Sequence, residues 1–374
     1  MHILFIIDSL SPGGAERQLV ELVKGLNRNG GYKISIGVLE RSETGYAEEI
    51  HDLNIDENLF LRKSRLDFKP ILMIRNYINT NAVDIVHGYL NLGAFYGTIA
   101  GKLAGRPVVC SSIRNAKDEN IRTGVNIKIE ARIADMLVSN SKAGFMNRFK
   151  ALRPNFRVIY NGTDFDRFND HAENSQIIKT QFQLGQFTHI IGMVATFSDY
   201  KDYESVLLSA QSVLTEYPSA GFLLIGDGPN LSRIKAMAAE LNLIDRVVFP
   251  GHRRDVEVFY PIMDLCLLMT RTERVLEGIS NSMVEAMACG VPVIASAGGG
   301  TDELIFHNET GIIVPPSNPY ALSQAIIQLL NDKNKRKALS GKAKADVYSR
   351  FNLARYVQDH IAVYNELVPC KVID

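Results

Sequence analysis

Residues 277–295 read Glu-Gly-Ile-Ser-Asn-Ser-Met-Val-Glu-Ala-Met-Ala-Cys-Gly-Val-Pro-Val-Ile-Ala. The stretch starts with Glu277 in a glycine-containing loop and continues into a short apolar helix that carries Glu285. Gly290 and Pro292 end this helix, and the apolar residues that follow begin a buried strand. A carboxylate accepts two hydrogen bonds side by side, which suits vicinal hydroxyls. The two glutamates are therefore a candidate site for a ligand with two sugar rings; two solvated glutamates beside an ordinary turn are the alternative.

Short apolar runs alternate with amphipathic segments along the whole chain. A first series of runs covers residues 2–8, 33–39, 84–88, 107–113, 136–140 and 157–160. A second series covers residues 189–195, 222–226, 246–250, 265–269, 292–296 and 311–314. Segments with helical periodicity lie between them, for example 15–26, 203–215, 231–240 and 319–330. Strands that alternate with helices form parallel sheets covered on both faces, so the fold class is α/β with two doubly wound, Rossmann-like domains.

The length of 374 residues also fits two domains of ordinary size. A polar stretch separates the two series of runs, and the domain boundary is placed at its start. This predicts an N-terminal domain over 1–163 and a C-terminal domain over 164–350. The remaining segment, 351–374, contains an amphipathic helix over 352–367, for which packing back on the N-terminal domain is one expectation and packing on the C-terminal domain the other.

The composition, with 46% hydrophobic and 22% charged residues, is that of a soluble globular protein. The net charge is zero, but residues 1–160 carry 22 basic and 16 acidic residues, and the rest carries 19 and 25. A basic first half facing an anionic surface or acceptor is one interpretation, and chance is the other. The cysteines are scattered and indicate reduced thiols; they are Cys110, Cys266, Cys289 and Cys370. The first apolar run is too short for a signal peptide, so a cytoplasmic protein is expected.

Glycine-rich turns follow several of the predicted strands. Gly13 and Gly14 open the first helix, where exposed backbone N–H groups and the helix dipole favour an anion. The turn is not a GxGxxG motif and lacks the acidic ribose partner downstream, which argues against a dinucleotide. In the second domain, similar turns at 226–229, 251–256 and 298–303 end strands at the edge where open α/β sheets bind ligands. Their clustering at one edge is hard to explain by packing alone.

With these motifs, the chain resembles glycosyltransferase family four, whose members are retaining, nucleotide-sugar-dependent enzymes. The resemblance implies the GT-B fold, in which two Rossmann-like domains face each other across a cleft. The residues that carry the likeness are Gly13 to Glu16, Asn140-Ser141, Ile159 to Asp164, Lys201-Asp202, Gly226 to Gly228, Gly251 with Asp255-Val256, Glu277 with Glu285, and Gly299-Gly300 with Glu303. The likeness covers nearly the whole chain and is densest from 192 to 315.

The resemblance implies a role for each matching position. Glu285 would hold the ribose hydroxyls, Glu277 would contact the donor sugar, and Lys201 would neutralise the diphosphate. The backbone of Gly14 would face the distal phosphate, and the turn after Gly251 would face the base. The predicted donor-binding residues are Gly14, Thr196, Lys201, Gly226, Gly251, Arg253, Val256, Glu277, Gly278, Ile279, Ser280 and Glu285. Glu277 and Lys201 are also the predicted catalytic residues.

Two positions depart from the family pattern. The arginine usual before the phosphate lysine is Thr196 here, and the usual histidine after the strand at 108–112 is absent. Arg114 stands near that position, and His87 ends the preceding strand; both are further catalytic candidates, although local hydrogen bonding explains His87 better.

The link before Glu277 is longer than the family usually has, and it contains Arg271 and Arg274. One of these two arginines is therefore predicted to replace the missing cation at the diphosphate.

The function implied is transfer of a sugar from a nucleoside diphosphate to a hydroxyl of a carbohydrate or lipid-linked acceptor, with retention, as in surface polysaccharide or glycolipid assembly. No metal or other cofactor is expected, and Asp164-Phe-Asp166 is interpreted as structural rather than as a metal-binding DxD. Two alternatives remain open, a nucleotide-sugar epimerase and a catalytically silent nucleotide-sugar binding protein. A dehydrogenase is disfavoured, and no nucleic-acid partner is expected.

The segment 142–157 carries five basic residues and no acidic one, interleaved with Phe145, Met146, Phe149 and Phe156. Such a segment can lie on an anionic membrane surface, with the aromatic side chains as anchors. This predicts a peripheral position on the inner face of the membrane. The alternative is an ordinary amphipathic helix packed on the sheet.

Overall fold

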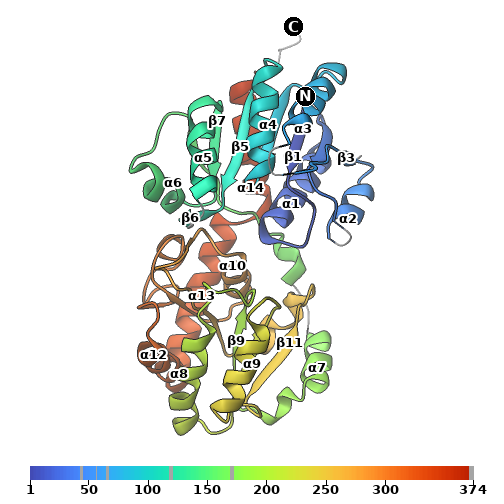
Figure 1. Cartoon of the computed structure of the whole chain (residues 1–374). Helices are drawn as coiled ribbons and strands as arrows, with labels where there is room; N and C mark the ends of the chain where they lie inside the picture. The colour runs from blue at the N-terminus through green and yellow to red at the C-terminus, as the bar shows by residue number, and fades with distance from the viewer. Residues whose placement is uncertain (43–44, 56, 65–66, 118–120, 169–171, 370–374) are drawn as a thin grey trace. The chain divides into compact units, whose positions relative to one another are not determined.

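The chain forms two compact units in the computed structural model (Figure 1). Unit 1 comprises Met1–Gly162 and Phe351–Asp374, and unit 2 comprises Thr163–Arg350. The structure describes residues 1–42, 45–55, 57–64, 67–117, 121–168 and 172–369. The boundary lies one residue before the position expected from the sequence, and the C-terminal segment belongs to unit 1.

Unit 1 is built on a sheet of seven parallel strands in the order β3-β2-β1-β4-β5-β7-β8. The strands are β1 (His2–Ile7), β2 (Lys33–Val38), β3 (Glu57–Leu59), β4 (Ile85–Tyr89), β5 (Val108–Ile113), β7 (Met136–Ser139) and β8 (Phe156–Val158), with a short β6 (Asn115–Lys117) outside this sheet. The helices are α1 (Gly14–Asn29), α2 (Ala47–His51), α3 (Lys69–Thr80), α4 (Leu92–Leu103), α5 (Ile121–Ile133), α6 (Lys142–Phe149) and α14 (Leu353–Leu367).

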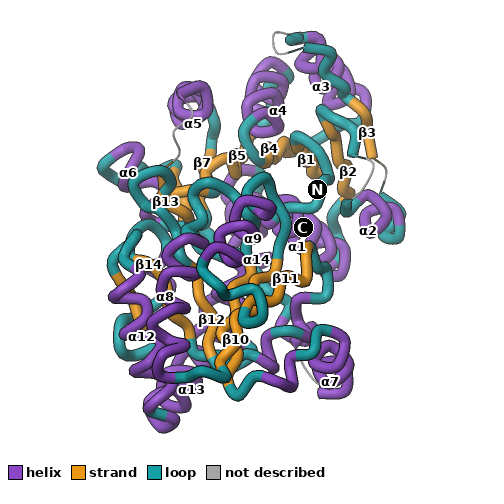
Figure 2. Tube along the Cα trace, turned by 60° about the horizontal axis from the view of Figure 1, so that its bottom comes forward, coloured by secondary structure: helices purple, strands orange, loops and turns teal. Residues whose placement is uncertain are grey.

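Two apolar clusters cover the two faces of this sheet. One cluster joins β1, β2 and β4 to α1, α2 and α14, and the other joins the sheet to α3, α4, α5 and α6. In Figure 2 the strands of unit 1 lie in a row, with α3, α4 and α5 on one side and α1 and α14 on the other. Strands buried on both faces need no polar side, which is why each reads as a continuous apolar run.

The C-terminal helix α14 completes the core of unit 1. Gly25 of α1 lies so close to Val357 that a Cβ there would fall 2.2 Å from Val357 Cγ2. At the sheet, the hydroxyl of Tyr356 lies 3.0 Å from that of Tyr89 and donates to the carbonyl oxygen of Gln18 at 3.1 Å. These buried contacts attach α14 to α1 and to β4.

Unit 2 has a second parallel sheet, with the order β11-β10-β9-β12-β14-β15. Its strands are β9 (His189–Val194), β10 (Ala220–Ile225), β11 (Val247–Gly251), β12 (Leu265–Leu268), β14 (Val293–Ser296) and β15 (Ile312–Val314), with a two-residue β13 (Leu276–Glu277) outside it. The α-helices are α7 (Ala172–Gln181), α8 (Tyr203–Glu216), α9 (Leu231–Glu240), α10 (Asn281–Ala288), α11 (Thr301–Leu304), α12 (Pro319–Asn331) and α13 (Lys333–Arg350). Short 3-10 helices are η1 (Phe165–Phe168), η2 (Leu184–Gln186), η3 (Val256–Val258) and η4 (Tyr260–Ile262).

Each apolar run of the two predicted series coincides with a strand of one of the two sheets, so the doubly wound α/β class is confirmed. The sequence did not indicate β3, β6 or β13. These strands are only two or three residues long and include polar residues, so they leave no apolar run to detect.

Candidate functional site

Lys201 and Glu277 form a buried ion pair in unit 2. The Nζ of Lys201 lies 2.7 Å from Oε1 and 2.6 Å from Oε2 of Glu277, so the lysine bridges both carboxylate oxygens. The side chains are only 6% and 19% exposed, respectively. The hydroxyl of Thr270 donates a third hydrogen bond, 2.6 Å long, to Oε2. The two predicted catalytic residues are therefore in direct contact, although 76 residues separate them in the sequence.

Strand ends and a helix start bring these groups together. Thr270 follows β12, and Lys201 precedes α8, whose N-terminus is capped by the Asp202 side chain through the N–H of Ser205. The backbones of Lys201 and Thr270 form an antiparallel bridge. On either side of it, Asp202 N donates to Met269 O at 2.9 Å and Arg271 N donates to Tyr200 O at 2.7 Å. This short two-chain ribbon fixes both sides of the ion pair.

The glycine turn at 298–300 packs against the backbone that carries Glu277. A Cβ on Gly299 would fall 2.3 Å from the carbonyl oxygen of Glu277, and one on Gly300 would fall 2.3 Å from the carbonyl carbon of Gly278. Gly300 N also donates to Glu277 O at 2.8 Å.

Close packing explains two further glycines at this edge. A Cβ on Gly226 would fall 2.0 Å from Ala195 O, and one on Gly228 would fall 2.7 Å from Phe197 O. Our expectation that packing alone does not account for the glycine-rich turns is therefore wrong for the turns at 226–228 and 298–300, where backbones approach too closely for a side chain.

Glu285 lies on the buried side of α10. It is only 4% exposed, and Tyr260 donates its hydroxyl hydrogen to Oε2 at 2.9 Å. Burial and the neighbouring carboxylate of Glu285 raise the pKa of Tyr260 well above its usual value, so the phenol stays a donor. The residues between the two glutamates enter α10 with Gly278 and Ile279 buried and Ser280 at the N-cap.

The turn after Gly251, which is predicted to face the base of the nucleotide, belongs to a separate group of residues at the ends of β10 and β11. Gly226 N donates to Gly251 O at 2.9 Å, which joins the two strand ends. The guanidinium of Arg253 bonds both oxygens of Asp255, at 2.9 and 2.6 Å, and lies over the Phe259 ring. Val256 is buried, whereas Thr196, beyond the end of β9, is exposed. A threonine provides no positive charge, so it does not replace the missing arginine.

The two arginines of the long link have different surroundings. Arg271 bonds Asp202 Oδ1 at 3.4 Å and makes an ion pair with Glu204. Its charge is thus already balanced by two carboxylates at the start of α8, which makes it an anchor for the link. Arg274 is exposed at the turn that follows. Between the two candidates for the missing cation, Arg274 is the one left without a carboxylate partner among the described residues.

In unit 1, the first turn of α1 carries the acidic side chain of Glu16. The backbone N–H groups of Glu16 and Ala15 favour the charged form of its carboxylate. It lies so close to Gly13 that a Cβ there would fall 2.1 Å from Oε2. Gly14, the predicted phosphate contact, is the first residue of the helix. Desolvation by burial raises the pKa of Glu16, partly offset by these N–H groups and by the charge of Arg114.

Arg114 follows β5 and is half-buried. Its guanidinium lies over the Tyr89 ring, 4.9 Å from the centroid, and donates to Asn161 Oδ1 at 3.3 Å. His87 is different, because it is completely buried. Its ring nitrogens lie 2.7 Å from the Tyr364 hydroxyl and 2.8 Å from the Ser111 hydroxyl. Burial keeps the pKa of His87 well below its usual value. The neutral ring therefore joins α14 to the sheet, which supports the interpretation that it is satisfied locally.

Two carboxyl groups near the ends of β1 and β5, a half-buried Asp8 and a buried Glu130, were not foreseen. Asp8 accepts from Gly93 N at 2.6 Å, and desolvation raises its pKa to about 6. Glu130 of α5 is completely buried, and Ser112 donates its hydroxyl hydrogen to Oε2 at 2.5 Å. Oε1 has no hydrogen-bond partner among the described residues. Desolvation raises the pKa of Glu130 to about 7. Glu130 lies three residues after Ile127 and four before Ala134, both buried, so helical periodicity is the signal that could have found it.

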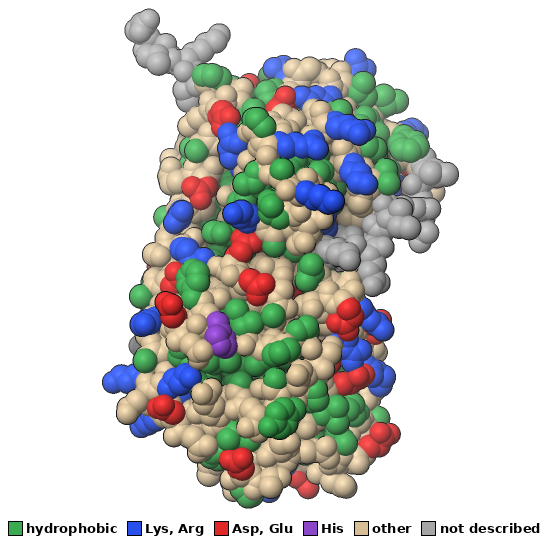
Figure 3. Space-filling view, turned by 90° about the vertical axis from the view of Figure 1, so that its left-hand side faces the viewer, with side chains coloured by type: hydrophobic (Ala, Val, Ile, Leu, Met, Phe, Trp, Pro, Cys, Tyr) green, Lys and Arg blue, Asp and Glu red, His purple; other side chains and the backbone are tan. Residues whose placement is uncertain are grey.

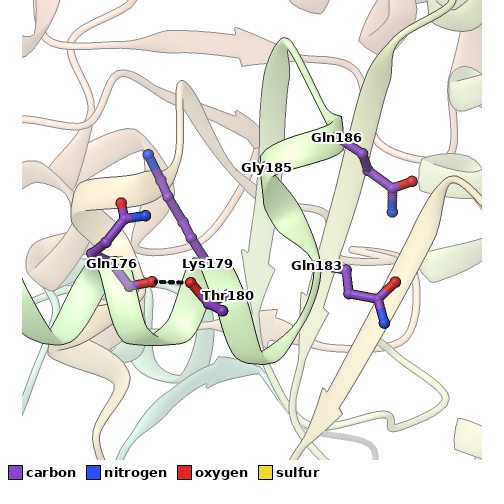
Figure 4. Close-up of a pocket in the computed structure, with 6 residues that line it drawn as sticks. All are labelled: Gln176, Lys179, Thr180, Gln183, Gly185 and Gln186. Atoms are coloured by element: carbon purple, nitrogen blue, oxygen red, sulfur yellow. Dashed lines mark hydrogen bonds between the residues drawn. The ribbon is translucent and has the colours of Figure 1, made fainter.

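A pocket lined mostly by polar residues lies elsewhere in unit 2, at α7 and η2. Its lining residues are Gln176, Lys179, Thr180, Gln183, Gly185 and Gln186 (Figure 4). Thr180 donates its hydroxyl hydrogen to the carbonyl oxygen of Gln176, one turn earlier in α7. None of the predicted site residues lines this pocket. Within the described parts of the chain, no group of three or more His, Cys, Asp or Glu side chains is placed to hold a metal ion.

Two family models match the chain. One is described as glycosyl transferases group 1 and matches residues 174–346, and the other is described as glycosyltransferase family 4 and matches residues 12–167. Among curated proteins, N-acetyl-alpha-D-glucosaminyl L-malate synthase of Bacillus anthracis is 27% identical over 237 residues, which are 63% of this chain and 60% of that protein. D-inositol 3-phosphate glycosyltransferase of Salinispora tropica is 25% identical over 314 residues, 76% and 64% of the two chains. The matches span less than two thirds of both relatives.

Solved structures match over almost the full chain. Anabaena HepE in complex with UDP-glucose has a TM-score of 0.86 at 22% identity and covers 98% of this chain and 100% of its own. A glycosyltransferase from Rickettsia africae has a TM-score of 0.83 at 21% identity and covers 99% of each chain. These likenesses confirm the GT-B fold.

Proposed function

Because this chain belongs to the glycosyltransferases of group 1 and family 4, we propose that it moves a sugar from a nucleoside diphosphate to a hydroxyl acceptor with retention of configuration. The observation that carries the proposal is the Lys201–Glu277 ion pair beside the ends of the unit 2 strands, with Glu285 in the helix that follows Glu277. Ligands of open α/β sheets bind at this edge, beyond the carboxyl ends of the strands. One cation and two carboxylates are what a diphosphate linked to two sugars requires.

Each of the three residues has a role in this proposal. Lys201 stabilises the negative charge that develops on the departing diphosphate, which is the main electrostatic demand of the reaction. Glu277 accepts hydrogen bonds from hydroxyls of the transferred sugar, and Glu285 accepts them from the ribose. The fully buried Tyr260 donates a hydrogen bond to Oε2 of Glu285 and thereby holds the carboxylate in place.

A panel of nucleotide sugars in a thermal-shift assay tests the proposal. The relatives differ in donor: HepE was solved with UDP-glucose, whereas a mycobacterial relative is named as GDP-mannose-dependent. The panel therefore includes both bases. A ligand at one hundred times its Kd should stabilise the fold by about 2.7 kcal/mol. Transfer of label from the selected donor to acceptor pools supports the proposal, binding without transfer favours a silent binding protein, and no binding contradicts both.

The first prediction concerns Glu285. Replacing it with glutamine keeps the size of the side chain and removes the charge that accepts the ribose hydroxyls. A hydrogen bond to a charged group contributes about 1.5–3 kcal/mol, so the Kd of the donor should rise roughly ten- to hundredfold. Calorimetric titration with the donor measures this change. Tyr260→Phe is the matched control. It removes a protein partner of Glu285, and it should raise the Kd of the nucleotide sugar less than Glu285→Gln does. Equal donor affinity in Glu285→Gln and the wild type would remove this residue from the site.

The proposed acceptor is lipid-linked, because unit 1 carries a basic surface with exposed apolar side chains. The part of Figure 3 where unit 1 lies shows Lys and Arg side chains dispersed among hydrophobic ones. Some residues that the sequence predicted for this surface do not belong to it, because they pack in the core or form ion pairs. Phe145 and Phe156 are stacked in the core and cannot act as anchors, and Arg157 is paired with Glu366.

What remains exposed comes from α5, α6 and the loop that follows α6. The exposed apolar residues are Val125, Met146 and Leu152, and the exposed basic residues include Lys128, Arg132, Lys150 and Arg153. None of the helices in the described part of the chain is both long and apolar enough to cross a membrane.

The second prediction tests this surface. Each basic residue near an anionic leaflet contributes about 1 kcal/mol, so replacing Lys128 and Arg132 with glutamate should abolish flotation with anionic vesicles. The same two charges reversed at Lys333 and Lys337, which are exposed on α13 of unit 2, serve as the control. The measurement compares vesicles of phosphatidylcholine with vesicles that contain phosphatidylglycerol. Equal flotation of wild type with both vesicles would contradict membrane association through this surface.

A further inference from the structure

The Glu277 carboxylate has two protein partners that differ in how a ligand affects them. Lys201 is charged and has three N–H donors, so it can exchange one carboxylate oxygen for a phosphate oxygen. Thr270 has a single hydroxyl hydrogen, which it already donates to Oε2 of Glu277 at 2.6 Å. Thr270 is only 4% exposed. A ligand that arrives at Lys201 therefore leaves the bond from Thr270 in place.

Thr270 is itself held on more than one side. Its backbone N donates to the Ser296 hydroxyl at 2.9 Å, and its backbone bridges that of Lys201. A β-branched side chain has few accessible rotamers, so fixing the backbone also fixes the direction of the hydroxyl. Of the six residues between Thr270 and Glu277, Arg271 is anchored to the start of α8 by Asp202 and Glu204. The link can therefore shift little without breaking these contacts.

We infer that Thr270 is a positioning residue, which holds the Glu277 carboxylate in its sugar-binding orientation when the diphosphate of the donor draws Lys201 away. The inference rests on the proposed function and adds to it a residue that touches neither the phosphates nor the sugar. Its consequence is a division of roles: Lys201 responds to the phosphates, and Thr270 keeps the orientation of Glu277 independent of them. Loss of the hydroxyl should therefore affect the sugar step more than nucleotide binding.

Three variants test this division. Thr270→Val keeps the shape and removes the donor, and Thr270→Ser keeps the donor. Thr310→Val removes the hydroxyl that accepts a hydrogen bond from Phe306 N elsewhere in unit 2, so it controls for the loss of a buried hydroxyl. The probes are UDP and UDP-glucose, with GDP and GDP-mannose in parallel. Calorimetry gives the Kd of each, and a transfer or donor-hydrolysis assay gives kcat and KM.

Thr270→Val should bind the free diphosphate within about twofold of wild type while kcat falls roughly ten- to hundredfold, as expected for a lost hydrogen bond to a charged group. Thr270→Ser should recover kcat to within about threefold, and Thr310→Val should lower Tm without lowering kcat. If kcat of Thr270→Val stays within about twofold of wild type, or if diphosphate binding falls in parallel with it, the inference is wrong.

The proposed function can fail separately. If the wild-type protein binds none of the four probes, the proposed function and this inference are both overturned. If the wild type binds and turns over the donor but the valine variant does the same, only the role of Thr270 is overturned. Far-UV circular dichroism of each variant confirms that the comparison is made on folded protein.

Discussion

Replacing Lys201 with methionine should destabilise unit 2 by about 3 kcal/mol and abolish sugar transfer. Methionine fills most of the volume of the lysine stem. The Glu277 carboxylate, which bonds Lys201 and Thr270 in the wild type, then keeps only the hydrogen bond from Thr270 of these two. A buried charge without its counter-ion typically costs 3–5 kcal/mol, and we expect the lower end because Glu277 is 19% exposed and reaches water. The chain has no tryptophan, so urea unfolding is best followed by far-UV circular dichroism.

A double variant separates the lost interaction from general damage. Lys201→Met combined with Glu277→Gln removes both charges, and most of the lost stability should return because no uncompensated charge stays buried. Activity should not return, since the diphosphate still lacks its cation. If the single and double variants are equally unstable, the ion pair is not what holds these two segments together.

Replacing Glu130 with glutamine should change how the stability of unit 1 depends on pH. The wild-type carboxyl has its pKa raised by burial to about 7, compared with the usual 4.5 in the unfolded chain. A raised pKa means that the folded state holds the proton more tightly, so this contribution is complete below about pH 4.5 and is lost as the pH rises through 7. Glutamine does not titrate. The stability of the variant relative to wild type should therefore grow by about 2 kcal/mol between about pH 5.5 and pH 8.5.

Hydrogen exchange read out on peptides of α5 and β5 restricts this measurement to unit 1. Because the amide of the glutamine can still accept from Ser112, little should change at the acidic end. Glu48→Gln, at an exposed glutamate of the same unit, controls for the loss of one negative charge. If the difference in stability between Glu130→Gln and the wild type is the same at both pH values, the pKa of Glu130 is not raised in the folded protein.

Several parts of the site could be predicted because they depend on local sequence. Gly290 and Pro292 end a helix wherever they occur in such a pattern, so the position of Glu285 in α10 followed from the residues around it. Glu277 was expected in a loop, whereas it lies in the two-residue strand β13. The alternation of apolar runs and helical segments gave the strands of both sheets, because a parallel strand buried on both faces leaves a continuous apolar run. The family pattern indicated Lys201, and in the structure its ammonium group bonds the Glu277 carboxylate.

Other parts depended on contacts between residues far apart in the chain. The family resemblance suggested a second cation from the long link, yet Arg271 turned out to be engaged by Asp202 and Glu204 on another helix. The sequence around residue 142–157 suggested aromatic anchors, yet Phe145 and Phe156 stack in the core, because an amphipathic helix looks the same whether its apolar face meets a sheet or a membrane.

The sequence by itself thus determined the two α/β units, the alternation of their longer strands with helices, and the polar residues at the ends of those strands. These properties follow from backbone preferences and burial patterns, which act over a few residues. Only the tertiary structure decided that Thr270 holds Glu277, that α14 closes the core of unit 1 through Tyr364 and His87, and that Glu130 is buried with a raised pKa. Hydrogen bonding and desolvation of a side chain are set by whatever segment packs against it, and no local pattern records that neighbour.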